Sequence, residues 1–282
     1  MIISRPLKNS LNSIMLFLST QDHIEVLKNL IALGRPKMFM VSPIKYSNEY
    51  TSLMVSFLLH NISASESLLT LYNTYSNQWF PTNIGYIIVR TMFETDITAH
   101  YITKDPTKRS LQYIQYGAII DKKQLAMCIN LCNSTNNSTK EYMQLMFKER
   151  YKNKEEEINN QYNKIKNNYT HNNKNGKKTL YKNWSGKSIH NMAIEVDHKE
   201  VYETLYTELS SFTHVDVKLA TRFLRVDLKG PYWSNKASEN DLGSVFQYAD
   251  IFLTCFLKLF GKEMTIWDEE EVDNCWNIKK RS

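Results

Sequence analysis

The sequence predicts an all-α fold: a single multi-helix bundle with one long charged helix and an inserted Lys/Asn-rich loop. First, apolar residues recur at three- and four-residue spacing along most of the chain. Second, the 282 residues include only 8 Gly and 6 Pro, too few for the tight turns of β-sandwiches or Rossmann folds. Third, 42% hydrophobic and 23% charged residues can build a core, which excludes a disordered chain.

The helices are expected in chain order, separated by breaker residues. Turn or breaker residues at 34–36, 80–83, 104–107 and 230–233 divide the apolar runs. The expected helices cover about 6–33, 48–76, 81–103, 106–132, 139–169, 185–194, 199–213 and 239–260. The segment 139–169 is the long charged helix, and 215–226 follows the helix that ends near 213. We find no internal repeat.

The domain organisation is expected to be simple. We expect one helical domain over 1–282, with a core over about 48–260, a Lys/Asn-rich insertion over about 150–183 and an acidic tail over 268–282.

The cysteines and the apolar runs predict a cytoplasmic protein. The four cysteines are too scattered for a zinc site or a disulfide scaffold, and we expect free thiols: Cys128, Cys132, Cys255 and Cys275. The apolar runs 14–18 and 251–260 are too short for an export signal or a membrane span. We therefore expect no membrane partner.

The charge balance permits a polyanionic partner. Lys plus Arg is 35 and Asp plus Glu is 29, giving +6. The stretch 159–183 is rich in Lys, Asn and Tyr, which suits contact with phosphates. The predicted nucleic-acid contacts are Lys174, Lys177, Lys178 and Lys182. The alternative is a solvated loop from an AT-rich genome.

The first chemical constellation lies in the third expected helix. Arg90 and Glu94 are four residues apart and therefore share a face, which also carries apolar residues. Functionally, Glu94 would act as acid/base or ligand and Arg90 would clamp an anion. The alternative is an ion pair that locks helix packing. Asp96 and His100 repeat the spacing on a neighbouring face, and we include His100 among the binding residues.

The second constellation is a polar helix edge. Steps of four place Tyr202, Tyr206, Ser210 and His214 along one edge, with Ser211 beside it. Histidine is the side chain most ready to move protons near neutral pH. We therefore predict His214 as a catalytic residue, and the tyrosines and serines as binding residues; the alternative is a packing or capping histidine.

Other catalytic signatures are excluded. The run 184–188 (Trp-Ser-Gly-Lys-Ser) lacks the upstream glycine of a phosphate-binding loop. We expect it to form a Trp-anchored turn with Ser185 as a helix N-cap. The sequence has neither a serine nucleophile elbow nor an HExxH motif.

In this order, the motifs resemble an uncharacterised prokaryotic family, domain-of-unknown-function family 5677. The matches cover about 50–260 and lie at 90–94, 105–106, 113, 116, 184–188 and 202–214. The resemblance implies an all-helical fold and candidate sites, but no reaction. The layout also looks like the HEPN superfamily of helical RNases in bacterial defence and toxin systems. Their Arg-x4-6-His motif is absent here, since nine residues separate Arg90 from His100.

We expect Arg90, Glu94, Tyr206, Ser211 and His214 to converge on one polar pocket. The expected function is an RNA- or nucleotide-acting effector in antiviral defence or a toxin-like system, working as a metal-independent ribonuclease. No cofactor and no metal are expected, although a carboxylate site with Glu94, His100 and His214 is a minor alternative. The main alternative is a non-catalytic binding module. A protein partner from the same operon and a homodimer are further expectations.

Overall fold

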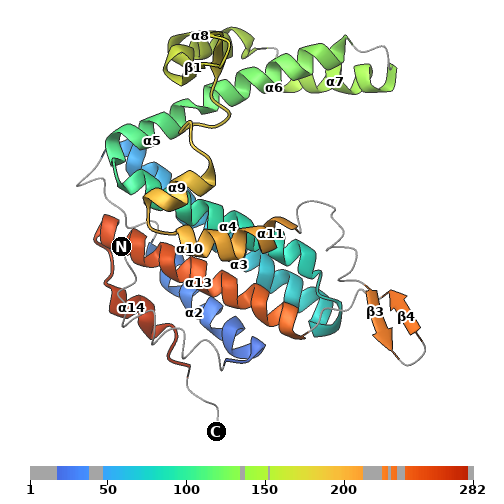
Figure 1. Cartoon of the computed structure of the whole chain (residues 1–282), viewed down its shortest axis with the longest axis vertical. Helices are drawn as coiled ribbons and strands as arrows, with labels where there is room; N and C mark the ends of the chain where they lie inside the picture. Colours follow the sequence, from blue (N-terminus) through green and yellow to red (C-terminus); the bar gives the residue numbers. More distant parts are fainter. Residues whose placement is uncertain are drawn as a thin grey trace. The chain divides into compact units, whose positions relative to one another are not determined.

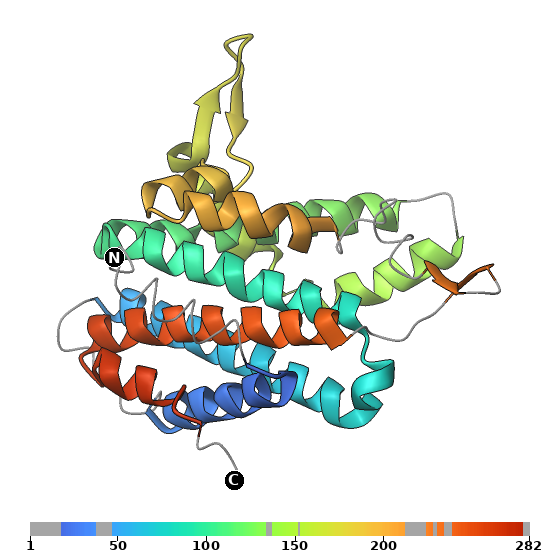
Figure 2. The same cartoon turned by 60° about the horizontal axis from the view of Figure 1, so that its bottom comes forward.

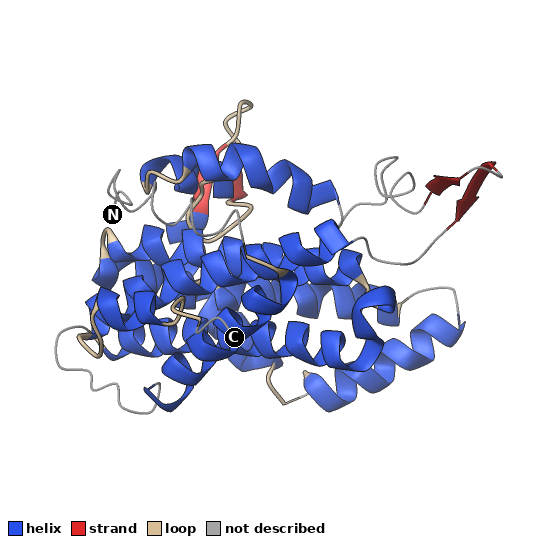
Figure 3. Ribbon diagram, turned by 90° about the horizontal axis from the view of Figure 1, so that it is seen from below, coloured by secondary structure: helices blue, strands red, loops and turns tan. Residues whose placement is uncertain are grey.

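The computed structural model describes residues 18–37, 47–133, 137–151, 153–211, 224–227, 230–233 and 239–278. Most of these residues are helical, and two short antiparallel hairpins complete the described elements (Figures 1 and 3). The prediction of an all-α fold is therefore confirmed.

The chain forms two compact units. Unit 2 is Asp105–Ser188, and unit 1 is the chain before and after it. Unit 2 thus begins well before the insertion expected at about 150–183. A single domain over 1–282 stays a prediction.

Unit 1 is built on four long helices: α2 (Thr20–Lys37), α3 (Asn48–Trp79), α4 (Thr82–Thr103) and α13 (Glu239–Met264). Helix α13 lies beside the other three (Figure 2). Its apolar face is fully buried, with Phe246, Leu253, Phe256 and Phe260 at 0% exposure, so it supplies much of the hydrophobic stabilisation of the unit.

Helix α2 continues through the expected breaker. It ends at Lys37 with Pro36 inside its last turn, so the stop predicted at 34–36 is wrong. A Cβ on Gly34 would lie 3.1 Å from a methyl of Leu257 and 3.2 Å from one of Ile62. The absence of a side chain at Gly34 therefore allows α2 to pack closely against α3 and α13, and does not serve a turn.

Helix α13 exceeds the length expected for it. Among the described helices it alone is long and apolar enough, over 240–264, to cross a membrane by length and composition. A buried core helix has the same properties, and 61% of that apolar window is buried inside the protein.

The expected acidic tail is folded. Helix α14 (Glu269–Asn274) begins at Asp268, whose side chain accepts a 2.9 Å hydrogen bond from the amide of Glu271. Val272 is fully buried, and Trp276 donates a hydrogen bond of 3.1 Å to Thr254 of α13. The tail is acidic on its surface but packs through its apolar side.

Unit 2 contains α5 (Pro106–Gln115), α6 (Gly117–Cys132), α7 (Asn137–Arg150) and α8 (Glu155–Ile165). Helices α6 and α8 share an apolar cluster that includes Leu125, Tyr151 and Ile158. The single long helix expected over 139–169 is therefore wrong, because the chain folds back to bury Tyr151 and Ile158. After α8 come a 3-10 turn, Lys166–Tyr169, and a hairpin rather than a loop.

That hairpin pairs β1 (Thr170–Asn172) with β2 (Lys178–Leu180) in antiparallel register. Tyr116 anchors its end by donating a 2.9 Å hydrogen bond to the carbonyl of Tyr181. Ser185 bonds within the following turn, to Asn183 and Lys187. The prediction of Ser185 as an N-cap is wrong, because the next helix begins only at Ile189.

A second hairpin pairs β3 (Leu224–Asp227) with β4 (Gly230–Trp233). The turn expected over 230–233 is thus a strand. Gly230 has a φ of 111°, a backbone conformation that residues other than glycine rarely adopt.

Candidate functional site

The candidate site of unit 1 lies between α4 and the segment that follows α9 (Ile189–Glu195). This segment comprises α10 (Lys199–Val201), a π-helical turn η2 (Tyr202–Tyr206) and α11 (Thr207–Ser211). It runs beside α4 in the opposite direction (Figure 2). The pairs that mark this alignment are Arg90 with Tyr206, Phe93 with Tyr202, and Asp96 with His198.

Arg90 is held from two sides. Its Nε donates a 2.9 Å hydrogen bond to Oε1 of Glu94, one helical turn away, and its Nη2 donates a 2.8 Å hydrogen bond to the hydroxyl of Tyr206. The side chains of Arg90 and Glu94 are 17% and 34% exposed. The predicted ion pair is therefore formed, but it lies at the edge of the core rather than inside it.

Two tyrosines form a stacked pair beside this ion pair. The rings of Tyr202 and Tyr206 are 4.3 Å apart at an angle of 16°, and the Arg90 guanidinium lies 4.9 Å from the Tyr206 ring. Both tyrosines belong to the π-helical turn, and such turns are frequent at functional sites. We call Arg90, Glu94, Tyr202 and Tyr206 the Arg–Tyr cluster.

The electrostatics of the cluster follow from partial burial. Burial alone would lower the pKa of Arg90, but the hydrogen bond and charge of Glu94, with the contribution of Tyr206, raise it. Burial, followed by the neighbouring Tyr206, raises the pKa of Tyr202 to about 12. At neutral pH Arg90 is therefore a cation and Tyr202 a neutral phenol.

A histidine that sequence reasoning missed extends the stack. The ring of His190, at the start of α9, lies 5.0 Å from that of Tyr202. Its Nε2 is 3.6 Å from Oε1 of Glu203, and its side chain is 40% exposed. An imidazole is thus present at the solvent end of the tyrosine stack. Its position twelve residues before Tyr202 gives no periodic signal.

The structure describes part of the predicted pocket. Arg90, Glu94 and Tyr206 meet, and Tyr202 joins them. Ser210 is half-buried on α11. The side chain of Ser211 and the whole of His214 lie outside the described residues, so their convergence stays a prediction.

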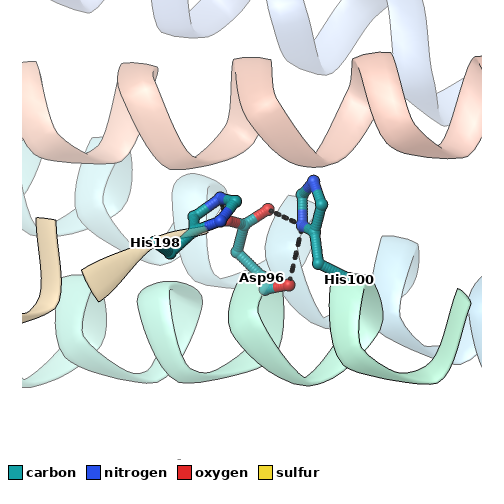
Figure 4. A group of neighbouring side chains, drawn as sticks. All are labelled: Asp96, His100 and His198. Carbon is teal, nitrogen blue, oxygen red and sulfur yellow. Dashed lines mark hydrogen bonds and ion pairs between the residues drawn. The ribbon is translucent and has the colours of Figure 1, made fainter. Parts of the chain in front are cut away.

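His100 belongs to a second cluster, with Asp96 and His198 (Figure 4). Its Nδ1 lies 3.0 Å from the backbone oxygen of Asp96 and 3.3 Å from Oδ1 of the same residue. The Nε2 of His198 lies 3.7 Å from Asp96 Oδ2, and the two imidazole rings are 4.7 Å apart. Glu94 pairs with Arg90 instead, so the structure does not support a metal site that uses Glu94.

The two imidazoles of this cluster differ in protonation. Burial would lower the pKa of His100, but the Asp96 carboxylate outweighs it and the pKa is raised. For His198 burial prevails over the attraction of Asp96, and the pKa is lowered. Cys255 of α13 is close enough to this carboxylate to be affected by its charge. Burial, followed by the charge of Asp96, raises the pKa of the Cys255 thiol to about 12.

The lysines predicted to contact nucleic acid lie in unit 2. All four are exposed, on or directly after the β1–β2 hairpin: Lys174, Lys177, Lys178 and Lys182. The hairpin gives these charges an ordered support.

The comparisons with known proteins give one match. The model of a family described as "Family of unknown function (DUF5677)" matches residues 51–231. This range includes the Arg90–Glu94 helix, the 184–188 turn and the Tyr202–Tyr206 turn. No curated protein and no solved structure matches the chain.

Proposed function

The chain belongs to the family of unknown function DUF5677, and from this premise we propose that it is an RNA- or nucleotide-acting protein whose Arg–Tyr cluster receives a phosphate group. The observation that carries the proposal is the geometry of Arg90, a guanidinium held in place by Glu94 and Tyr206 that still reaches solvent. Arginine with a fixed planar fork is well suited to phosphate recognition.

Each group of the cluster has a role in this proposal. Arg90 binds the phosphate and stabilises charge that develops on it. Glu94 fixes the guanidinium, and the tyrosine pair adds an aromatic surface next to the phosphate position. Cleavage also needs a general acid/base, which is most often an imidazole, and the candidates are His190, beside Tyr202, and His214, predicted from sequence.

The lysines of unit 2 support a polyanionic substrate. Contacts from Lys174, Lys177, Lys178 and Lys182 to phosphates would be independent of base sequence. Replacement of all four by Gln should weaken binding to single-stranded RNA. It should also lower the slope of log affinity against log salt by up to about 3, because each phosphate contact contributes about 0.7.

Biologically, we propose a HEPN-like effector in antiviral defence or a toxin-like system, acting in the cytoplasm. The support is the helical layout and the Arg-centred site; the usual Arg-x4-6-His spacing is missing.

Incubation of the purified full chain with total RNA tests the proposal. Wild type should cleave RNA without added metal, and Arg90→Lys should lose most of this activity, because lysine cannot bond Glu94 and Tyr206 in the same geometry. Loss of cleavage in either His190→Gln or His214→Ala, but not in both, would identify the acid/base.

Arg35→Lys is the matched control, since Arg35 is an exposed arginine of α2 that pairs with Glu66. If wild type leaves RNA intact, the protein is not a ribonuclease. If wild type and Arg90→Lys cleave RNA equally, the Arg–Tyr cluster is not the site of cleavage.

The second candidate function is a non-catalytic binding module. The observation in its favour is that Arg90 is engaged by groups of the protein itself, which is what a structural lock between α4 and the π-helical turn requires. In that case the Arg90→Lys variant would lose stability, and wild type would bind a protein partner without cleaving RNA.

A further inference from the structure

We propose that Asp96, His100 and His198 form a binding site for one first-row transition-metal ion of the Zn²⁺ class. The site (Figure 4) joins α4 to the N-terminal end of the segment that carries Tyr206. Asp96 and His100 lie on a face of α4 next to that of Arg90 and Glu94. It goes beyond the proposed function, because it requires neither RNA binding nor cleavage.

The donor atoms lie close to the spacing of a metal site. Zinc is bound at about 2.0–2.1 Å by imidazole nitrogen and at about 2.0–2.2 Å by carboxylate oxygen, so two ligand atoms at a tetrahedral angle are about 3.3 Å apart. Nδ1 of His100 is 3.3 Å from Asp96 Oδ1, and Nε2 of His198 is 3.7 Å from Oδ2. The three ligand atoms lie within 4.8 Å of one another.

The backbone at the end of α9 fixes one of these donors. Asp197 has a left-handed φ of 62°, its amide donates to the carbonyl of Ile194 at 3.3 Å, and the amide of His198 donates to that of Ala193 at 2.8 Å. These two bonds form a Schellman motif, which usually places glycine where Asp197 stands. The motif holds His198 against Asp96.

The outer contacts of His198 also suit a ligand. Its Nδ1 lies 2.7 Å from the carbonyl of Val196, which requires the proton on Nδ1 and leaves the lone pair of Nε2 directed at Asp96. Metal-ligating histidines typically donate their second nitrogen to a carbonyl or carboxylate in this way, which fixes the tautomer and the ring orientation.

The carboxylate at the centre is the second, independent indication of a ligand. Asp96 is 1% exposed, and its Oδ1 has the 3.3 Å ion-pair contact with Nδ1 of His100 but no hydrogen bond of good geometry among the described residues. A buried acceptor without a good hydrogen bond is destabilising. A cation bound to Oδ1 and the two imidazoles would satisfy it. On His100 this cation would replace the Nδ1 proton, which now lies between the carbonyl and the carboxylate of Asp96.

The donor set determines the class of ion. Two imidazoles and one carboxylate suit Zn²⁺, Fe²⁺, Co²⁺ or Ni²⁺, whereas Mg²⁺ and Ca²⁺ prefer oxygen ligands. Three protein ligands also leave a coordination position open for water or another small ligand, as in catalytic rather than structural zinc sites.

Metal titration of the untagged full chain, first stripped with chelator, tests the proposal. Isothermal titration calorimetry should show one equivalent of Zn²⁺ bound, and Co²⁺ should give the visible absorption of a low-symmetry site, whereas Mg²⁺ should not bind. His198→Gln should weaken Zn²⁺ binding by more than the roughly 10- to 100-fold that loss of an outer partner costs.

His60→Gln, at an exposed position of α3 in the same unit, is the matched control and should bind as wild type does. Asp96→Asn keeps the shape of the side chain and should likewise lose the Co²⁺ spectrum, while circular dichroism verifies that each variant is folded. Absence of Zn²⁺ binding in wild type, or equal binding in wild type and His198→Gln, would overturn the proposal. RNA cleavage plays no part in this readout, so either proposal can fail without the other.

Discussion

Arg90 and Tyr206, 116 residues apart in the chain, share a 2.8 Å hydrogen bond from guanidinium Nη2 to the phenol oxygen. The same guanidinium lies 4.9 Å from the centre of the Tyr206 ring. This contact joins α4 to the π-helical turn and orients Arg90 for the phosphate role proposed for it.

Tyr206→Phe separates the contribution of the Tyr206 hydroxyl to stability from that of its aromatic ring. The variant keeps the stack with Tyr202 but loses a hydrogen bond to a charged group, which is worth about 1.5–3 kcal/mol. We expect a loss of that size in the free energy of unfolding, measured by urea denaturation. Tyr75→Phe, at a 48% exposed position of α3, should change it by less than about 0.5 kcal/mol; equal effects of the two changes would contradict the account.

The raised pKa of Tyr202 predicts that the folded protein loses stability at alkaline pH. Burial and the neighbouring Tyr206 raise its pKa to about 12 in the folded state, against about 10 when unfolded. The folded protein therefore holds this proton more tightly. Its contribution to stability is fully present below about pH 10 and is lost as the pH rises to about 12.

The difference between wild type and Tyr202→Phe isolates this effect from other groups that titrate there. Chemical denaturation at several pH values should show a steeper decline for wild type across that window. Parallel declines would refute the environment assigned to Tyr202.

The cluster of Asp96, His100 and His198 predicts an order of protonation. The folded pKa of His100 is raised, so its contribution to stability is present below about pH 6.5 and is lost as the pH rises through the raised value. His198 has the opposite sign, because its lowered pKa contributes stability above about pH 6.5 that is lost as the pH falls.

Nitrogen-detected NMR of the imidazoles, in metal-free protein, separates the two histidines. His198 should lose its proton at a lower pH than His100. In Asp96→Asn the His100 titration should move to lower pH. A His198 that titrates above His100 would contradict the geometry.

Much of the fold follows from local patterns, and the errors have physical causes. Helical periodicity predicted α3, α4 and α13 to within a few residues, because each buries a continuous apolar stripe. It did not predict the division between α7 and α8, which depends on Tyr151 and Ile158 packing against α6. Nor did it predict the strands β1–β4, since such short segments carry almost no periodic signal.

The candidate site shows the same limit. The four-residue spacing of Arg90 and Glu94 predicted their ion pair, and the spacing of Tyr202 and Tyr206 predicted a shared edge. Asp96 was noted beside His100, but its proximity to His198 depends on how two distant segments align. The left-handed Asp197 that positions His198 has no signal of its own, because glycine is the residue expected there.

Gly261→Ala tests the packing of Trp267 on α13. A Cβ at this position would contact the Trp267 indole and lie 2.9 Å from its backbone oxygen. Such overpacking costs about 1–3 kcal/mol, which should appear as a lower thermal midpoint. Gly117→Ala, with no atom within 4 Å of the added carbon, should leave the midpoint unchanged or raise it, and equal losses in both would contradict the packing of Trp267 on α13.

Binding of a labelled short single-stranded RNA, measured by fluorescence anisotropy at fixed salt, tests the central claim most directly. The account predicts that Arg90→Lys weakens binding by about tenfold or more, since a charged hydrogen bond contributes at least about 1.4 kcal/mol, while Arg35→Lys binds as wild type does. Equal affinities of wild type and Arg90→Lys would show that the phosphate does not bind at the Arg–Tyr cluster.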